Sequence, residues 1–576
     1  MSIRPTFFGF EVARSGLSSS QRKIDVTGQN IANMNTLGYS RQRVAVSAIG
    51  AGGMDWRYAI SPSQNVGMGV NIDSIRRVRD EFLDIRFRTE HSHNERLSVK
   101  SDVLASIENL LDEFVTDNVY ALLGDFMNAL QNLHMESDEQ EFASMMRSTA
   151  LKLTSTLNTI AHDMNGVIEM QLMQMELVAT MVNRIARELD EVNREIRVQH
   201  MINPLIVSNE LLDKRDTLLD ELSRFGEVTV LHDRKVMPDG SEIATGGIWV
   251  YFGSVNVEDI NHDDFAHPNL LVVGDRRGHR TINLGPIGPG DPEFPRTHWL
   301  DEQGLYRLSP QDHHPGPVRF QWGEGVGISI DELGLGAGDD FFTRSGQIFG
   351  YYEMMNGRGD VAAYGDELDQ ATKGIPYFVA ILNSFAQVFA NTFNMLNDEG
   401  FIEDEYGMRM PGPRLFDAAG DPGGDIDIFN ITISEDWQRN PMAIARSMST
   451  SDTPGASRND NILRMIDALR REDTFFDLEE TGGSGAMSGS FSQFIGMLNS
   501  EISLEIDYNN SRLTMSDVVL MSIDQMRESI KGVSEDEEAM NLVRFQRSYQ
   551  AAARLMTTLD EMLELIIMRM GIVGRS

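Results

Sequence analysis

The residue types that most often bind metals or catalyse reactions occur in this chain, but their spacing forms no recognisable site. The twelve histidines are scattered, and the only close pairs are His91 with His93 and His313 with His314. Neither pair has a third ligand at metal spacing, and the zinc-enzyme pattern HExxH does not occur. The chain has no cysteine, which excludes disulfides, thiol catalysis and cysteine metal sites.

Two other clusters carry residues that bind cations or phosphates in other proteins. One segment mixes aspartates with glycines: Asp417, Asp421, Asp425 and Asp427. It lacks the spacing and the terminal glutamate of an EF-hand loop. Residues 334–338 are rich in glycine, but they lack both the G-x-G-x-x-G pattern and a P-loop lysine. We therefore expect no catalytic residue, no metal and no cofactor, and we predict that the protein is not an enzyme.

The bulk composition indicates a soluble protein of several domains. With 576 residues, 41% of them hydrophobic and 24% charged, the chain is long enough to bury several cores. No apolar run approaches the roughly 18 residues that span a bilayer, and the N-terminus lacks the apolar core and cleavage site of a secretory signal. The net charge of −37 disfavours nucleic acid and anionic membranes as partners, because phosphate contact needs a basic surface.

Since no catalytic site has to be positioned, the most informative elements are the two ends of the chain. Near the C-terminus, apolar residues recur at alternating steps of three and four, a period of 3.5 that keeps one stripe facing a partner helix. This C-terminal assembly seam consists of Leu542, Phe545, Tyr549, Ala552, Met556, Leu559, Leu563 and Ile566. The N-terminal assembly seam consists of Phe10, Leu17, Ile24 and Ile31, and its companion positions Ala13, Ser20 and Thr27 are small or semi-polar. We predict that the two ends pair with each other, with neighbouring copies, or with both.

Between the ends, the pattern is helical, then β-rich, then helical again. Helical patterns cover residues 1–37, 80–114, 119–134, 137–203, 209–225, 362–397, 440–470, 488–531 and 535–570. Residues 47–72 are glycine-rich and predict an extended loop or a hairpin. In the longest helix the apolar seam shifts after Val167, which is a stutter in the coiled-coil sense. The shifted seam consists of Met170, Met173, Leu177, Met181, Leu189, Val192 and Ile196.

The predicted fold class is a multidomain α+β protein. Its terminal helices pair as a coiled-coil stalk, followed by a helical domain and an outward, proline-rich and β-rich insertion. The predicted domains are a terminal domain at 1–79 and 511–576, a helical domain at 80–226, 341–400 and 436–510, a β-rich outer domain at 227–340, and a small β excursion at 401–435.

Three stretches resemble signatures of bacterial flagellar axial proteins. Residues 28–42 resemble the N-terminal signature of that group, and residues 537–562 resemble its C-terminal signature. Residues 209–216, Asn-Glu-Leu-Leu-Asp-Lys-Arg-Asp, resemble a motif of the hook-associated proteins. Together with Gly-Tyr-Ser-Arg-Gln after the first helix, this motif narrows the resemblance to the flagellar hook-associated protein 1 family, the hook–filament junction proteins. The axial signature residues are Asn30, Asn33, Asn35, Gly38, Tyr39, Arg41 and Gln42.

The resemblance implies a structural adaptor that joins the flagellar hook to the filament. The subunit would assemble with like copies into a ring through its terminal helices, with the hook protein on one side and a second hook-associated protein on the other. It would be secreted by the flagellar type III apparatus without a cleaved signal peptide. A cytoplasmic export chaperone would bind its C-terminal helix. Asp213, Arg215 and Asp216 would fix the packing between the helical domain and a neighbouring helix, unless they form only a solvated ladder on their own helix.

Three alternatives stay open at this point. The chain resembles other axial proteins as well, such as the second junction protein or the hook protein. An exported enzyme, for instance a peptidoglycan hydrolase, would need a cleft with two paired carboxylates, and the carboxylates here are too numerous to nominate a pair. An exported adhesin would use the β-rich insertion, and deletion of residues 230–335 would then remove binding alone.

Overall fold

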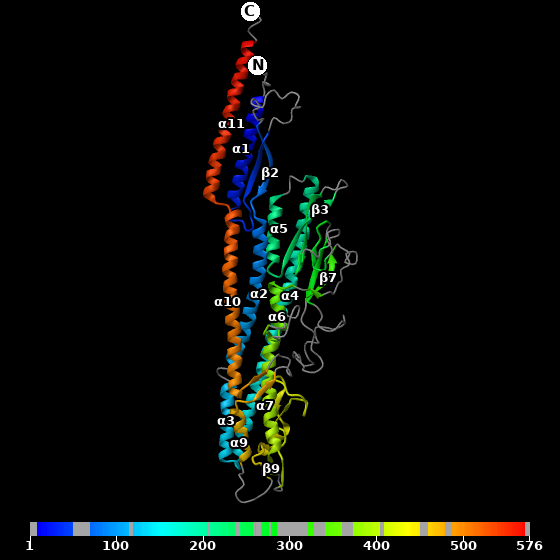
Figure 1. The fold of residues 1–576 in the computed structure, drawn as a ribbon, viewed down its shortest axis with the longest axis vertical. Coiled ribbons are helices and arrows are strands. Elements are labelled where there is room, and N and C mark those ends of the chain that lie inside the picture. The colour runs from blue at the N-terminus through cyan, green and yellow to red at the C-terminus, as the bar shows by residue number, and fades with distance from the viewer. Residues whose placement is uncertain are drawn as a thin grey trace, which may run out of the picture.

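The computed structural model describes residues 8–49, 69–114, 119–203, 208–236, 242–256, 260, 267–275, 278–284, 320–326, 340–341, 343–359, 372–403, 408–449, 459–477 and 486–570. These residues form an elongated molecule in which the first helix begins and the last helix ends at the same end (Figure 1). The chain therefore travels out along the length of the molecule and returns, so that segments far apart in sequence lie side by side.

The end that carries both termini is built from two helices and a hairpin. Helix α1 (Phe8–Asn33) lies alongside α11 (Glu535–Met570), and β1 (Gln42–Ala48) pairs antiparallel with β2 (Val70–Arg77). We call these four elements the terminal rod. The segment 47–72, predicted to be an extended loop or a hairpin, joins these two strands, and its residues 50–68 lie outside the described part. Helix α1 ends four residues before the predicted end at residue 37.

Below the terminal rod, α2 (Glu81–Phe114) runs beside α10 (Phe491–Lys531) (Figure 1). From Ile502 onward, four buried positions of α10 recur every seven residues, and two of them are polar: Ile502, Asn509, Ser516 and Ile523. Asn509 donates to the carbonyl of Leu97 at 2.9 Å, and Ser516 donates to Glu90 at 2.7 Å. Hydrogen bonds therefore add to apolar contact in this helix pair, and they specify its register.

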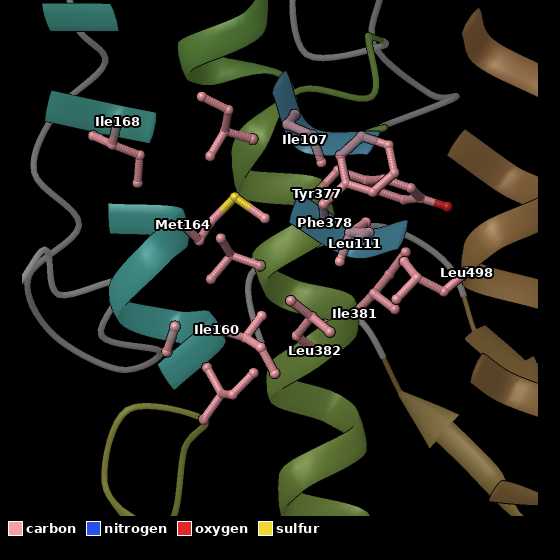
Figure 2. Close-up of a cluster of buried hydrophobic side chains, with 14 of the residues drawn as sticks. Ile107, Leu111, Ile160, Met164, Ile168, Tyr377, Phe378, Ile381, Leu382 and Leu498 are labelled. Carbon is pink, nitrogen blue, oxygen red and sulfur yellow. The ribbon is translucent and has the colours of Figure 1, made fainter. Parts of the chain in front are cut away.

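The helical body is completed by α3 (Tyr120–Met135), α4 (Gln140–Ile202), α5 (Asn209–Leu222), α6 (Gly346–Asn356), α7 (Ile375–Glu399) and α9 (Asp460–Arg470). Figure 2 shows its core, where side chains from four helices meet: Ile107 and Leu111 of α2, Ile160, Met164 and Ile168 of α4, Tyr377, Phe378, Ile381 and Leu382 of α7, and Leu498 of α10. Because these helices come from residues 81–531, the core joins both halves of the chain.

The middle of α4 departs from the predicted seam. The residues that face the core between 168 and 182 are Ile168, Gln171, Met175, Val178 and Val182. The residues predicted to do so are exposed instead: Met170, Met173, Leu177 and Met181. For these four residues the prediction was wrong, because this part of the helix carries two apolar stripes and the buried stripe contains a glutamine. The later members of the predicted seam, Leu189, Val192 and Ile196, are buried.

A six-stranded antiparallel sheet confirms the β-rich insertion. Its strands follow each other in chain order: β3 (Val228–Val236), β4 (Glu242–Phe252), β5 (Leu270–Val272), β6 (His279–Leu284), β7 (Phe320–Val326) and β8 (Asp340–Phe341). One face of the sheet lies on α4 and shares its apolar core. Asn193 of α4 donates to the carbonyls of Ile248 and Val273, and Asn183 donates to that of Ile282. The insertion is therefore not a free outer domain, because one face of its sheet packs against α4 and buries the apolar side of that helix.

Three further details differ from the expectation. A helix begins at Gly346, before the predicted start at 362, while residues 360–371 lie outside the described part. Where a helix was predicted over 440–470, the structure has a 3₁₀ turn (Pro441–Ala443) and α9, and residues 450–458 lie outside the described part; a short α8 (Glu435–Arg439) precedes them. Helix α10 runs unbroken across the predicted domain boundary at residue 511, so the terminal rod begins at α11. The excursion at 401–435 holds β9 (Phe401–Glu403), β10 (Arg409–Pro411), β11 (Phe416–Ala418) and β12 (Ile431–Ile433), and a later hairpin pairs β13 (Phe475–Asp477) with β14 (Ala486–Ser488).

Candidate assembly site

Helices α1 and α11 meet in antiparallel register with a repeat of seven residues. A methyl group added to Gly9 would lie 3.0 Å from Leu559, and one added to Gly16 would lie 3.6 Å from the Cβ of Ala552. Seven residues further along α1 and seven back along α11, the ammonium of Lys23 lies 5.6 Å from the ring centre of Phe545. One more step of this kind brings Asn30 to Glu538, 3.3 Å apart. The small residues on α1 let the two backbones approach closely.

The N-terminal seam predicted from the sequence lies beside this contact, one residue away from its centre. Phe10, Leu17, Ile24 and Ile31 are half-buried, whereas their companions Ala13, Ser20 and Thr27 are buried. The large apolar side chains therefore border the helix contact and the small ones fill it. A half-exposed apolar edge is left along α1.

The C-terminal seam is also only partly covered. Leu542, Phe545, Ala552, Met556, Leu559 and Leu563 are half-buried, whereas Tyr549 is 37% exposed and Ile566 is 47% exposed. Further large apolar residues are exposed near the end of α11: Met562, Leu565, Ile567 and Met568. A single helix and a hairpin thus leave most of the apolar surface of α11 open, which is unusual for an isolated chain.

Among the axial signature residues, Asn30 ties three segments together. Its side chain is 1% exposed. Its amide nitrogen donates to the carbonyl of Gln42 at 3.0 Å and to Glu538, and its oxygen accepts from the backbone of Gln42 and from the hydroxyl of Tyr39, each at 2.9 Å. Burial and the carboxylates of Asp213, Glu210 and Glu538 raise the pKa of Tyr39, so its hydroxyl remains a donor.

The remaining signature residues shape the chain after α1. Asn33 donates to the carbonyl of Gln29 in the last turn of the helix, and Asn35 is exposed. Gly38 has a φ of +79°, and a Cβ there would lie 2.3 Å from the hydroxyl of Thr217, so only glycine fits. Arg41 donates its backbone N–H to the carbonyl of Lys531 and its guanidinium to Glu537, at 2.8 and 2.9 Å.

The internal motif on α5 lies against these same residues. Asn209 donates to the side chain of Gln42 at 3.1 Å, and Asp213 accepts the backbone N–H of Ser40 at 3.1 Å. Gln29 donates to Glu210 at 2.7 Å. The three stretches that resemble known signatures, far apart in the sequence, therefore converge where the terminal rod meets the helical body.

A buried set of charges continues from this point. This arginine–aspartate cluster consists of Arg77, Arg79, Arg88, Arg527, Asp84, Asp213, Asp216 and Asp220. Its members come from β2, α2, α5 and α10, except Arg79, which lies between β2 and α2. The four positive and four negative charges balance, which is what allows so many ions to leave water together.

The cluster forms a closed circuit. Arg527 joins Asp84 to Asp220 at 2.9 and 2.5 Å, and Arg79 joins Asp84 to Asp216 at 2.9 and 3.0 Å. Arg88 completes the circuit from Asp220, at 2.7 Å, to Asp216, at 3.6 Å. Arg77 adds a branch from Asp216 to Asp213, with contacts of 2.7 and 2.8 Å. The circuit fixes the angle at which α5 and α10 meet the terminal rod.

Sequence reasoning nominated only part of this arrangement. It named Asp213, Arg215 and Asp216, and all three are involved in packing: the aspartates accept from arginines, and Arg215 donates to the carbonyl of Gly246 in β4 at 3.1 Å. It missed the arginine partners. The available signal was the concentration of arginines at positions 76, 77 and 79 in an otherwise acidic chain.

The charge circuit predicts a dependence of stability on acid pH. Burial alone would raise the pKa of Asp216, but the guanidinium groups of Arg79, Arg77 and Arg88 outweigh it and hold the pKa below its usual range. A carboxylate with a lowered folded-state pKa stabilises the fold above its unfolded pKa of about 3.9, and this stabilisation is lost as the pH falls through the folded pKa. We expect the denaturation midpoint of the protein to fall as the pH is lowered below about 4, and to fall less steeply in the variant Asp216→Asn. Equal slopes in the two proteins would contradict this assignment.

The residues that first suggested chemistry have local roles where the structure describes them. Asp417 accepts the backbone N–H groups of Ala418 and Gly423, and Asp427 accepts those of Phe429 and Asn430. The other members of that aspartate segment, Asp421 and Asp425, lie in the same turn and loop region, and His91 contacts Ser223 at 3.1 Å. Within the described ranges, no three histidine or acidic side chains are grouped to hold a metal ion, and no helix has the length and hydropathy to cross a bilayer. His313, His314 and residues 334–338 lie outside the described part.

Three family models match parts of this chain. Residues 104–248 match the flagellar hook-associated protein FlgK helical domain. Residues 10–39 match the flagella basal body rod protein, and residues 527–569 match the C-terminal domain of the flagellar basal body rod FlgEFG proteins. The two rod-type matches cover α1 and α11, and the helical-domain match ends within β4.

Curated relatives match over nearly the whole chain. Flagellar hook-associated protein 1 of Bacillus subtilis is 25% identical, with 99% of each chain covered, and that of Escherichia coli is 23% identical, with 96% of this chain and 98% of the relative covered. Among solved structures, the flagellar hook junction protein FlgK from Burkholderia pseudomallei matches with a TM-score of 0.50 and 11% identity, covering 78% of this chain and all of that one. At that identity, the structural match supports the fold alone.

Proposed function

We propose, from the premise that this chain belongs to the flagellar hook-associated protein 1 family, that it is a structural adaptor joining the flagellar hook to the filament. The observation that carries the proposal is the convergence of the N-terminal signature, the internal motif and the C-terminal helix at one place, around Asn30 and Asp213. A subunit whose two ends and body are tied together there can pass a mechanical load between neighbours without a catalytic group.

The exposed apolar residues of the terminal rod suggest how subunits contact one another. We propose that α1 and α11 form a coiled-coil stalk, supported by the seven-residue register from Gly9 to Asn30. Their exposed apolar residues would be covered by like subunits in a ring, since an exposed apolar stripe of this length indicates a protein interface. Hook protein and a second hook-associated protein would contact the two sides of that ring.

Export belongs to the same proposal. The chain would leave the cell through the flagellar type III apparatus without a cleaved signal peptide, and a cytoplasmic chaperone would hold the C-terminal helix until assembly. The support is the open apolar face of α11, including Leu565 and Met568, which needs cover in a dilute cytosol.

The proposal separates two kinds of contact on α11, and two substitutions test them. Ala552→Arg should open the rod itself, because Ala552 faces Gly16 at close approach. Leu565→Asp should leave the rod of the isolated subunit intact, because Leu565 is 51% exposed, but it should block assembly.

Both strains should have bare hooks and should release filament protein into the medium, as seen by electron microscopy and by blotting the culture supernatant. Circular dichroism of the purified subunits should show helix loss in the first variant only. Arg547→Ala is the matched control, because Arg547 is exposed on the same helix. Normal filaments in the Leu565→Asp strain would refute assembly through this face of α11.

A further inference from the structure

Two helices of the helical body each carry a stripe of exposed apolar side chains, outside the terminal rod. On α10 the stripe fits a period of 3.5 residues, with Ser511 as its one polar position. This α10 stripe consists of four residues that are 61–71% exposed: Leu504, Tyr508, Met515 and Val518. Large apolar side chains that line up on one exposed helix face indicate a surface that another protein covers.

The second stripe is the part of the predicted α4 seam that the structure leaves exposed. This α4 stripe consists of Met170, Met173, Leu177 and Met181, which are 37–67% exposed. Three of its four members are methionines, whose flexible side chains adapt to an uneven partner surface. Because a different stripe of α4 fills the core, the α4 stripe is available for a contact outside the chain.

The two stripes lie at the same level along the length of the molecule. Ile160 of α4 and Leu498 of α10 reach the same core (Figure 2), and both helices run from this core toward the terminal rod (Figure 1). Leu177 and Met515 each lie seventeen residues further along their helices, which is about 26 Å at a rise of 1.5 Å per residue. The centres of the two stripes are therefore level with each other.

A second pair of contacts confirms this level at the other end of the stripes. Arg184 of α4 forms an ion pair with Glu221, and Arg527 of α10 forms one with Asp220. Glu221 and Asp220 are neighbours on α5, so the two arginines reach the same level. Both stripes end before these arginines and begin after the core of Figure 2.

We propose that the α4 stripe of one copy packs on the α10 stripe of the next copy at the same level. This inference rests on the assembly of like subunits proposed above and adds a contact in the helical body to those of the terminal rod. The two stripes lie on helices that α2 separates (Figure 1). Because the two surfaces differ, each contact leaves one stripe of either kind open for a further copy, as in a ring and unlike in a two-fold dimer.

One pair of charges fits this packing. Arg512 lies beside the α10 stripe, with its guanidinium 5.6 Å from the ring centre of Tyr508. It forms no ion pair among the residues that the structure describes. Glu176 is exposed beside the α4 stripe. Counted from the shared core, Glu176 and Arg512 differ in level by only about 3 Å, so they would approach each other across the contact and favour this register.

The contact is too small to hold two dilute copies together. Four side chains on each helix bury far less than the roughly 1,200 Å² of a stable interface. In the assembled state the terminal rods would already hold neighbours side by side, and a weak contact then forms at a high effective concentration. The contact must therefore be tested in assembled material.

The chain has no cysteine, so an introduced pair reports on this contact alone. In a strain that makes only the double variant Leu177→Cys, Met515→Cys, hook–filament structures are isolated and mildly oxidised. They are then blotted for this protein after a non-reducing gel. We expect a ladder of dimers, trimers and larger species, because each copy carries both halves of the contact and a disulfide needs Cα atoms within about 7 Å. Two single-cysteine variants made in the same cell should give dimers only.

The matched control moves one cysteine along the same helix. Met201 of α4 is 84% exposed and lies about 36 Å beyond Leu177. The double variant Met201→Cys, Met515→Cys should therefore assemble in the same way and give no ladder. A ladder from this control would contradict the proposed register.

The remaining outcomes separate this inference from the proposed function. If the protein is present in the isolated structures but the Leu177–Met515 pair gives no ladder, the stripe contact is refuted and the adaptor function stands. Dimers from Met515→Cys alone would show that α10 stripes pair with each other, and a monomer of altered mobility would show that the stripes meet within one chain. Either result would overturn the proposal.

Absence of the protein from the isolated hook–filament structures would refute the adaptor function instead. The same oxidation of the purified double variant at high concentration would then decide on the stripe contact. A ladder there would support it, and monomers alone would overturn it.

Discussion

Replacing Arg527 with methionine is expected to lower the free energy of unfolding of the helical body by about 3–5 kcal/mol, the usual cost of breaking a buried ion pair from one side. The side chain of Arg527 is 3% exposed and contacts two aspartates, Asp84 and Asp220. It also lies 4.0 Å from the ring centre of Phe87. Methionine would keep part of the apolar contact but would leave two carboxylates short of a partner.

The measurement is guanidinium chloride unfolding followed by circular dichroism, with the wild type as reference. Several domains contribute to such a curve, so the quantity to compare is the midpoint of the transition that includes α2 and α10. Arg547→Met, at an exposed site on α11, is the matched control and should change the midpoint little. If Arg527→Met lowers the free energy of unfolding by less than about 1 kcal/mol, the ion pairs of this arginine are worth no more than ordinary surface ion pairs.

Replacing residues 240–320 with a short glycine–serine linker is expected to destroy the soluble protein and not merely to trim its surface. The insertion was predicted to face outward, but its sheet covers an apolar face of α4 that includes Val182, Ile185 and Leu189. Removal of the whole of strands β4, β5 and β6 would expose that face and leave Asn193 and Asn183 without their backbone partners. Aggregation during expression is the expected result.

A matched deletion separates this effect from the loss of chain length. Residues 286–318 connect β6 to β7, and Leu284 is paired directly with Phe320. A short linker can therefore bridge the two strands. We expect the 286–318 replacement to give a soluble monomer by gel filtration, and the 240–320 replacement to give aggregates. A soluble, cooperatively folded product from the larger replacement would restore the picture of a detachable outer domain.

The sequence was sufficient for most helix positions and for the location of the site, but not for its partners. The starts and ends of α2, α10 and α11 agree with the periodicity to within a few residues, because long apolar repeats leave few alternatives. The motif at 209–216 lies on α5 beside the arginine–aspartate cluster. The arginines that bind it lie more than a hundred residues away in the chain, and nothing in local spacing connects Arg527 to Asp220.

Where a helix carries two possible apolar stripes, the sequence pattern predicted that the wrong stripe would be buried. Met173 is a better core residue than Gln171 by hydrophobicity alone, yet Gln171 is buried and Met173 is 67% exposed. The same happened on α1, where Gly9 and Gly16 face the partner helix and the larger Phe10 and Leu17 lie beside it. Periodicity finds the apolar residues of a helix, but close packing selects the face that fits.

The polar packing of α10 on α2 has a consequence for the export proposed above, in which the chain would have to open before it assembles. Separation of two helices that pack through leucines would expose an apolar surface that promotes aggregation. Separation of α10 from α2 instead uncovers Asn509 and its partner, the carbonyl of Leu97, together with the pairs of Ser516 with Glu90 and of Asp517 with Asn94. Water can hydrate these polar groups. Helices α10 and α11 can therefore separate from α2 and pack against it again with little aggregation. The same hydrogen bonds restore a single register when the helices pack again.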